Sequence, residues 1–165
     1  MGSAVTGLKA GVLAGIVYGA ILAVISYFSV QGMKDTIIAS IQNALPANST
    51  ITAEGAYELA LTLAPVAAVI VGILGGLLLG AIYGWLVEKI PGGSYSVKGL
   101  FFGVALWFIF SVLLGLGNLE YGVVDYLTGL ATGIVPALIF GFILGYLYGR
   151  FLPKPKPDPY LSPPT

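Results

Sequence analysis

The stretch Gly76-Leu77-Leu78-Leu79-Gly80-Ala81-Ile82-Tyr83-Gly84 has a glycine at every fourth position, with apolar residues or Tyr between the glycines. In water each such glycine weakens a helix by about 1 kcal/mol relative to Ala. In lipid, a helix face without side chains lets a second backbone approach closely, and such pairs cross at about −40°. The stretch therefore predicts a membrane-spanning helix that packs tightly against a neighbour.

The composition of the whole chain agrees with a membrane protein. Of 165 residues, 58% are hydrophobic and 8% are charged, whereas soluble domains carry about 25% charged residues. The apolar residues form four runs, and each is long enough to cross a bilayer, which takes about 20 residues. The sequence thus predicts an all-α integral membrane protein, a four-transmembrane-helix bundle. Its spans are at about 8–29, 59–87, 99–117 and 127–150, within a domain of residues 1–152.

The four-residue glycine spacing recurs in the other runs. The predicted helix-packing residues are Gly11, Gly15, Gly19, Gly76, Gly80, Gly84, Gly141, Gly145 and Gly149. In the third run, Gly99 and Gly103 keep the spacing and Trp107 interrupts it. Val69, in the second run, is expected to be less crowded than Gly80 or Gly145. Residues 76–84 and 141–149 agree at five of nine positions. This repeat predicts two similarly oriented helical hairpins, which either duplication or glycine-rich composition explains.

Three of the runs place a Tyr directly before a glycine, at Tyr18, Tyr83 and Tyr148. Tyr83 and Tyr148 lie near the ends of their runs, where a phenol can reach the lipid headgroups. Tyr18 lies about 15 Å deep at 1.5 Å per residue, so its hydroxyl requires a partner. A backbone carbonyl or a Thr is the simpler partner, and a bound small molecule is the alternative.

The distribution of charge predicts the orientation in the membrane. Six of the seven basic residues share one side with both termini: Lys9, Lys89, Lys98, Arg150, Lys154 and Lys156. Basic residues gather on the cytoplasmic side, so both termini are expected to be cytoplasmic in a multi-pass plasma-membrane protein. Few Asn, Gln, Met and no Cys are typical of a thermophile, so we expect a prokaryotic source, with a thermophilic archaeon as one candidate.

The loop 30–58 is expected on the outer side and to contain a short amphipathic helix. Four apolar residues in it have helical spacing: Ile37, Ile38, Ile41 and Leu45. Asp35 can cap this helix and Pro46 can end it. Its apolar face is expected to lie against lipid, and the alternative is that this face binds a partner protein. Asn48 follows in a possible glycosylation sequence.

Residues 153–165 form a Pro-rich cytoplasmic tail, with six prolines in thirteen residues. Such a segment favours extended polyproline II and reaches about 40 Å. Tyr160 and Leu161 are its apolar residues and the predicted binding residues for a groove on another protein. The alternative is a solvated end.

The chain lacks the usual residues for catalysis. It has no His and no Cys, and its charged residues stand at the ends of the spans, where interfacial solvation accounts for them. We therefore expect no enzyme activity, no cofactor and no metal site. Equal numbers of acidic and basic residues give no basic footprint for nucleic acid. The expected partners are membrane lipids and other membrane subunits or copies of itself.

Two functions remain open. The first is a structural or accessory subunit of a homo-oligomeric or larger membrane complex, packed through glycine faces. The alternative is a passive channel or small-solute facilitator formed by oligomers, lined by Tyr18, Ser111, Thr128 and Thr132. A channel requires these four side chains to converge on a continuous cavity, whereas a subunit allows them to face separate neighbours.

Overall fold

A computed structural model describes residues 3–46, 49–113, 116 and 122–153, and four of its helices are long and apolar enough to cross a membrane. In chain order the elements are α1 (Ala4–Gly32), α2 (Lys34–Ala44), α3 (Ala53–Leu86), α4 (Tyr95–Trp107), the π-helical segment η1 (Phe108–Leu113) and α5 (Val123–Phe151). The spanning helices are α1, α3, α4 with η1, and α5. The prediction of an all-helical chain with four such helices is confirmed for these residues.

The spanning helices begin earlier than the apolar runs indicate. α1, α3 and α4 start at residues 4, 53 and 95, against predicted starts of 8, 59 and 99. Each is preceded by a hydroxyl residue whose oxygen accepts a hydrogen bond from a backbone N–H in the first turn: Ser3, Thr52 and Ser94. Such caps set where a helix starts, whereas hydropathy detects only its apolar part.

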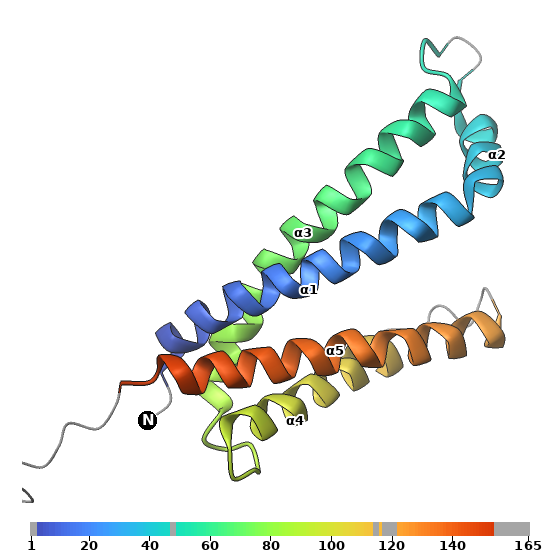
Figure 1. The fold of residues 1–165 in the computed structure, drawn as a ribbon. Helices are drawn as coiled ribbons and strands as arrows, with labels where there is room; N and C mark the ends of the chain where they lie inside the picture. The colour runs from blue at the N-terminus through green and yellow to red at the C-terminus, as the bar shows by residue number, and fades with distance from the viewer. Residues whose placement is uncertain (1–2, 47–48, 114–115, 117–121, 154–165) are drawn as a thin grey trace, which may run out of the picture.

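The spanning helices form two pairs, α1 with α3 and α4 with α5 (Figure 1). The pairs meet at the end that holds the start of α1, the connection between α3 and α4, and the end of α5. This end is called the terminal end below. The pairs diverge toward the opposite end, called the loop end, where α2 connects α1 to α3 (Figure 1).

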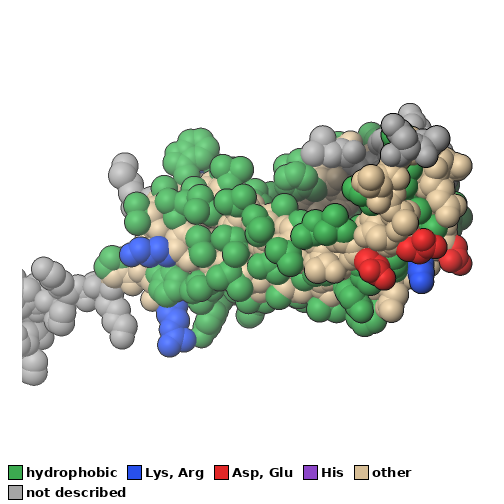
Figure 2. Space-filling view, turned by 90° about the horizontal axis from the view of Figure 1, so that it is seen from above, with side chains coloured by type: hydrophobic (Ala, Val, Ile, Leu, Met, Phe, Trp, Pro, Cys, Tyr) green, Lys and Arg blue, Asp and Glu red, His purple; other side chains and the backbone are tan. Residues whose placement is uncertain are grey.

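Charged side chains separate between the two ends. On the face that Figure 2 shows, basic side chains gather at the terminal end and acidic ones at the loop end, while the acidic Glu88 lies in the connection between α3 and α4 at the terminal end. The described basic residues of the terminal end are Lys9, Lys89, Lys98 and Arg150, and Lys34 lies in α2 at the loop end. The apolar surface between these two ends matches the profile expected of a membrane span.

The main cluster of buried residues lies in the terminal half of the molecule, and near the loop end Ala53 and Tyr57 in the first turns of α3 are also buried. The buried apolar residues of the main cluster are Ala10, Ala14, Tyr83, Val87, Phe102, Phe140, Leu144 and Tyr148. None of the described side chains is buried in 20–32, 58–71, 104–113 or 123–135. These four segments, called the loop-end halves below, include about half of each spanning helix. The two helix pairs therefore share a core only near the terminal end.

The short helix expected in loop 30–58 is α2. It begins after Met33 without a side-chain cap, and Asp35 lies inside its first turn instead of capping it. Its four half-buried apolar residues are Ile37, Ile38, Ile41 and Leu45. α2 contacts α3, with the Lys34 ammonium 5.6 Å from the ring centroid of Tyr57. None of the residues of α2 is buried, and the contact of its apolar face with lipid or a partner stays a prediction.

Candidate functional site

The closest helix contact joins α1 to α3 through backbone atoms. A Cβ atom added to Gly76 would lie 2.6 Å from the Cα of Gly15, and one added to Gly80 would lie 2.6 Å from the Cα of Gly11. Carbon atoms pack optimally at about 3.5–4.0 Å. No side chain fits at these positions unless the two helices move apart.

The α1–α3 contact extends in both directions from its centre. At the terminal end, a Cβ on Gly84 would lie 2.6 Å from the carbonyl oxygen of Ser3. Toward the loop end, a Cβ on Gly19 would lie 2.9 Å from the Cα of Val69. Val69 is half-buried, whereas Gly80 and Gly145 are buried, which agrees with the expectation that Val69 is less crowded, although its backbone continues the surface against which Gly19 packs.

The contact between α4 and α5 is built in the same way. A Cβ on Gly99 would lie 2.8 Å from the Cα of Gly145, and one on Gly141 would lie 2.9 Å from the Cα of Gly103. Gly129, nearer the loop end of α5, has nothing within 4 Å of its added Cβ. The close approach of α4 and α5 therefore belongs to the part of the pair near the core.

Three tyrosines connect the two pairs, and we call Tyr83, Tyr95 and Tyr148 the tyrosine junction. The Tyr83 hydroxyl donates to the Tyr95 carbonyl oxygen at 2.8 Å, and the Tyr148 hydroxyl accepts from the Ser3 backbone N–H at 2.9 Å. The ring of Tyr148 lies 5.4 Å from each of the other two rings. The junction thus contacts α1, α3, α4 and α5 together.

The tyrosine junction corrects the expectation that Tyr83 and Tyr148 reach the headgroups. Both side chains have 0% exposure, and their hydroxyls bind groups of the chain itself. A sequence signal for this burial exists, because each Tyr follows a packing glycine (Gly80 or Gly145) by three residues and so shares its helix face. Their partners could not be found in this way, because they depend on how distant segments pack.

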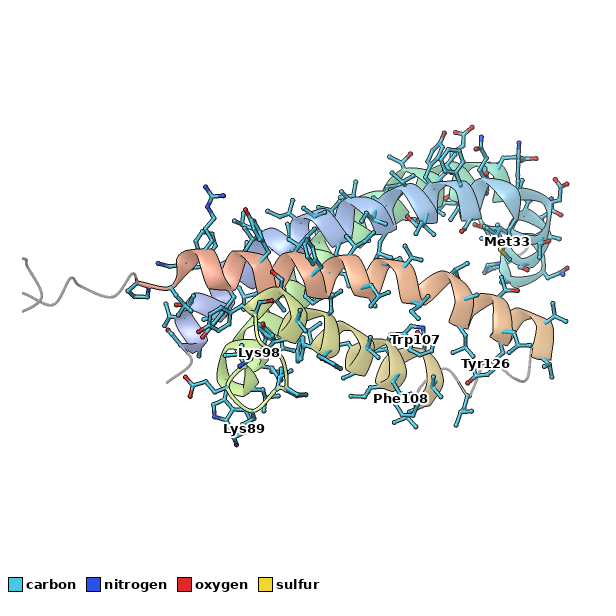
Figure 3. The ribbon with its side chains drawn as sticks, turned by 60° about the horizontal axis from the view of Figure 1, so that its bottom comes forward. Met33, Lys89, Lys98, Trp107, Phe108 and Tyr126 are labelled. Carbon is cyan, nitrogen blue, oxygen red and sulfur yellow. The ribbon has the colours of Figure 1, made fainter. Side chains whose placement is uncertain are left out.

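Two lysines lie close to the connection between α3 and α4 (Figure 3). The Lys98 ammonium donates to the Val87 carbonyl oxygen at 3.0 Å, which satisfies a free carbonyl at the end of α3. The Lys89 ammonium lies 5.0 Å from the ring centroid of Trp85. Lys98 is therefore held by the fold, whereas Lys89 is exposed and lies on the surface.

The described cavity that Tyr18 lines does not include the other three side chains predicted to line a pore, which are Ser111, Thr128 and Thr132. Tyr18 lines a cavity of about 210 Å³ with Phe110 and Phe140. Within the described residues its hydroxyl makes no hydrogen bond, so the carbonyl or Thr partner is not found among them. Thr128 and Thr132 are exposed and donate to carbonyls of their own helix.

The fourth of these side chains, Ser111, lies elsewhere. Its hydroxyl oxygen would be 3.0 Å from a Cβ on Gly133. Beside it, Trp107 and Tyr126 join α4 and η1 to α5 (Figure 3). The Trp107 indole N–H donates to the Leu130 carbonyl at 3.0 Å, and the Tyr126 hydroxyl donates to the Val112 carbonyl at 3.3 Å. These polar groups act in contacts between helices.

The profile of a family of unknown function, DUF6789, matches residues 1–158. The chain belongs to this family. Neither a curated protein nor a solved structure matches the chain.

Three predicted site residues of this DUF6789 protein lie outside the described residues. They are Asn48 of the possible glycosylation sequence, and Tyr160 and Leu161 of the tail. Over the ranges that the structure describes, no group of three or more His, Cys, Asp or Glu residues could hold a metal ion.

Proposed function

We propose that this DUF6789 protein is a non-catalytic structural or accessory subunit of a homo-oligomeric or larger membrane complex. The distribution of burial carries the proposal. No described side chain is buried in the loop-end halves, although the helices there remain long and apolar. A partner that packs against these halves would complete the bundle.

In this proposal the two helix pairs are hairpins held by glycine ladders, meaning glycines at every fourth position on the helix faces that meet. Support comes from the backbone contacts of Gly11 with Gly80 and of Gly99 with Gly145. Each ladder then joins helices of one chain. The surface offered to a partner therefore consists of the larger side chains of the loop-end halves, such as Val24, with 58% exposure.

The proposal also includes an orientation in the plasma membrane. Four described basic residues at the terminal end support cytoplasmic termini. The acidic residues Asp35, Glu54 and Glu58 at the loop end agree with an outward position. The alternative of a channel formed by oligomers is less favoured, since the described cavity that Tyr18 lines does not include Ser111, Thr128 or Thr132.

Photo-crosslinking in native membranes tests the subunit role. A photoreactive residue is placed at Val66 or Val135 in the loop-end halves, or at Leu78 in the terminal half as a control. All three side chains have 53–60% exposure. We expect protein adducts, identified by mass spectrometry, from Val66 or Val135 but not from Leu78. Only lipid adducts from all three positions, or equal protein adducts from all three, would refute the proposal.

A further inference from the structure

A groove of about 610 Å³ runs between α3 and α4 near the terminal end. Its walls are large apolar side chains, among them Ile82 and Leu86 of α3 and Phe101 of α4. Ile90, in the connection between the helices, lines its terminal end. Lys89 is the one charged residue among the residues that line it. We call this feature the α3–α4 groove.

The dimensions of the groove resemble those of one lipid leaflet. At 1.5 Å per residue, its lining extends for about 13 Å along the α4 side, from Phe101 to Phe110. A leaflet contributes about half of the roughly 30 Å hydrocarbon core. An acyl chain that enters from the terminal end can therefore lie along most of the groove.

The mouth of the groove is placed at the headgroup level. Lys89 lies there with Trp85, whose exposure is 68% and whose ring centroid is 5.0 Å from the Lys89 ammonium. Trp and Tyr are enriched where the membrane meets water. Lys98, the second cation of this region, is bonded to Val87, so Lys89 is the lysine positioned to meet a ligand.

We propose that the α3–α4 groove binds an anionic phospholipid, with an acyl chain between α3 and α4 and the phosphate at Lys89. Basic pockets between membrane helices bind anionic headgroups. A transmembrane helix of a partner fits this surface less well, since helix interfaces in membranes are rich in small residues and Ala105 is the one small residue of the lining. The lipid site does not depend on the proposed subunit role.

Native mass spectrometry of the purified full chain tests the proposal. The protein is supplied with equal amounts of phosphatidylglycerol and phosphatidylcholine, which share their acyl chains and differ in charge. We expect phosphatidylglycerol to be retained preferentially. Lys89→Gln should lower its binding constant by about fivefold, the equivalent of about 1 kcal/mol per basic residue near the headgroups. Lys9→Gln, at the same end of α1, should leave binding unchanged.

A second variant tests whether the acyl chain occupies the groove. Ala105 lines the groove and is exposed, so Ala105→Trp fills the space without entering the core. We expect this variant to keep its thermal stability and lose retention of the lipid. Equal binding of the two lipids, equal effects of Lys89→Gln and Lys9→Gln, or undiminished binding by Ala105→Trp would each overturn the proposal.

Discussion

Gly75 and Gly76 are neighbours on α3 with opposite surroundings, and they allow a direct test of the glycine contact. A Cβ on Gly76 would collide with the Gly11 carbonyl oxygen and lie 2.6 Å from the Cα of Gly15, whereas a Cβ on Gly75 would have nothing within 4 Å. We expect Gly76→Ala to destabilise the protein relative to Gly75→Ala. Both substitutions gain the same helix propensity, about 1 kcal/mol, so this gain cancels in the comparison.

The size of the effect follows from the separation that Gly76→Ala demands. Restoring about 3.5 Å between carbon atoms from the 2.6 Å at Gly15 moves α1 and α3 apart by about 1 Å. The colliding atoms belong to backbone, so no flexible side chain can give way. Overpacking of this kind costs about 1–3 kcal/mol. The two variants should therefore differ by about 1–3 kcal/mol in the free energy of unfolding.

Steric trapping of the purified protein in lipid bicelles measures this difference in the free energy of unfolding. A matched pair of variants on the α4–α5 helix pair is Gly141→Ala, where a Cβ meets the Cα of Gly103 at 2.9 Å, and Gly129→Ala, where it meets nothing within 4 Å. Equal stabilities within both pairs would refute the view that backbone contact at these glycines holds the helices together.

Three further outcomes are expected. A cysteine at Ser49 should react with an impermeant thiol reagent on intact cells and one at Ser94 should not, because basic residues favour a cytoplasmic terminal end; the reverse labelling contradicts this orientation. Tyr83→Phe should lower the unfolding free energy by about 0.5–1.5 kcal/mol through loss of one buried hydrogen bond, whereas Tyr146→Phe, on an exposed side chain, should not. Deletion of residues 154–165 should leave insertion intact and reduce recovery of any partner; undiminished recovery would indicate a solvated end.

The helices could be predicted from the sequence because a span requires a long apolar run, and such a run is visible in residue order. The starts of the helices could not be predicted from hydropathy. The start of α3, for example, is set by a cap in which the Thr52 hydroxyl oxygen accepts a hydrogen bond from the Gly55 backbone N–H, and hydropathy does not detect such a cap. The burial of Tyr83 and Tyr148 was also missed. Their burial depends on contacts with Ser3 and Tyr95, and these contacts exist only in the packed arrangement of the four helices.

The glycine contacts restrict how the proposed partner could bind. Close backbone approach requires a glycine face on both helices, and α1 and α3 use theirs on each other, as α4 and α5 do near the core. A partner that packs on the loop-end halves meets mostly larger side chains, which keep two backbones apart. Its binding then depends on van der Waals contact over a wide area. Single substitutions at Val24, Val66 or Val135 should therefore weaken assembly only slightly, whereas several together should abolish it.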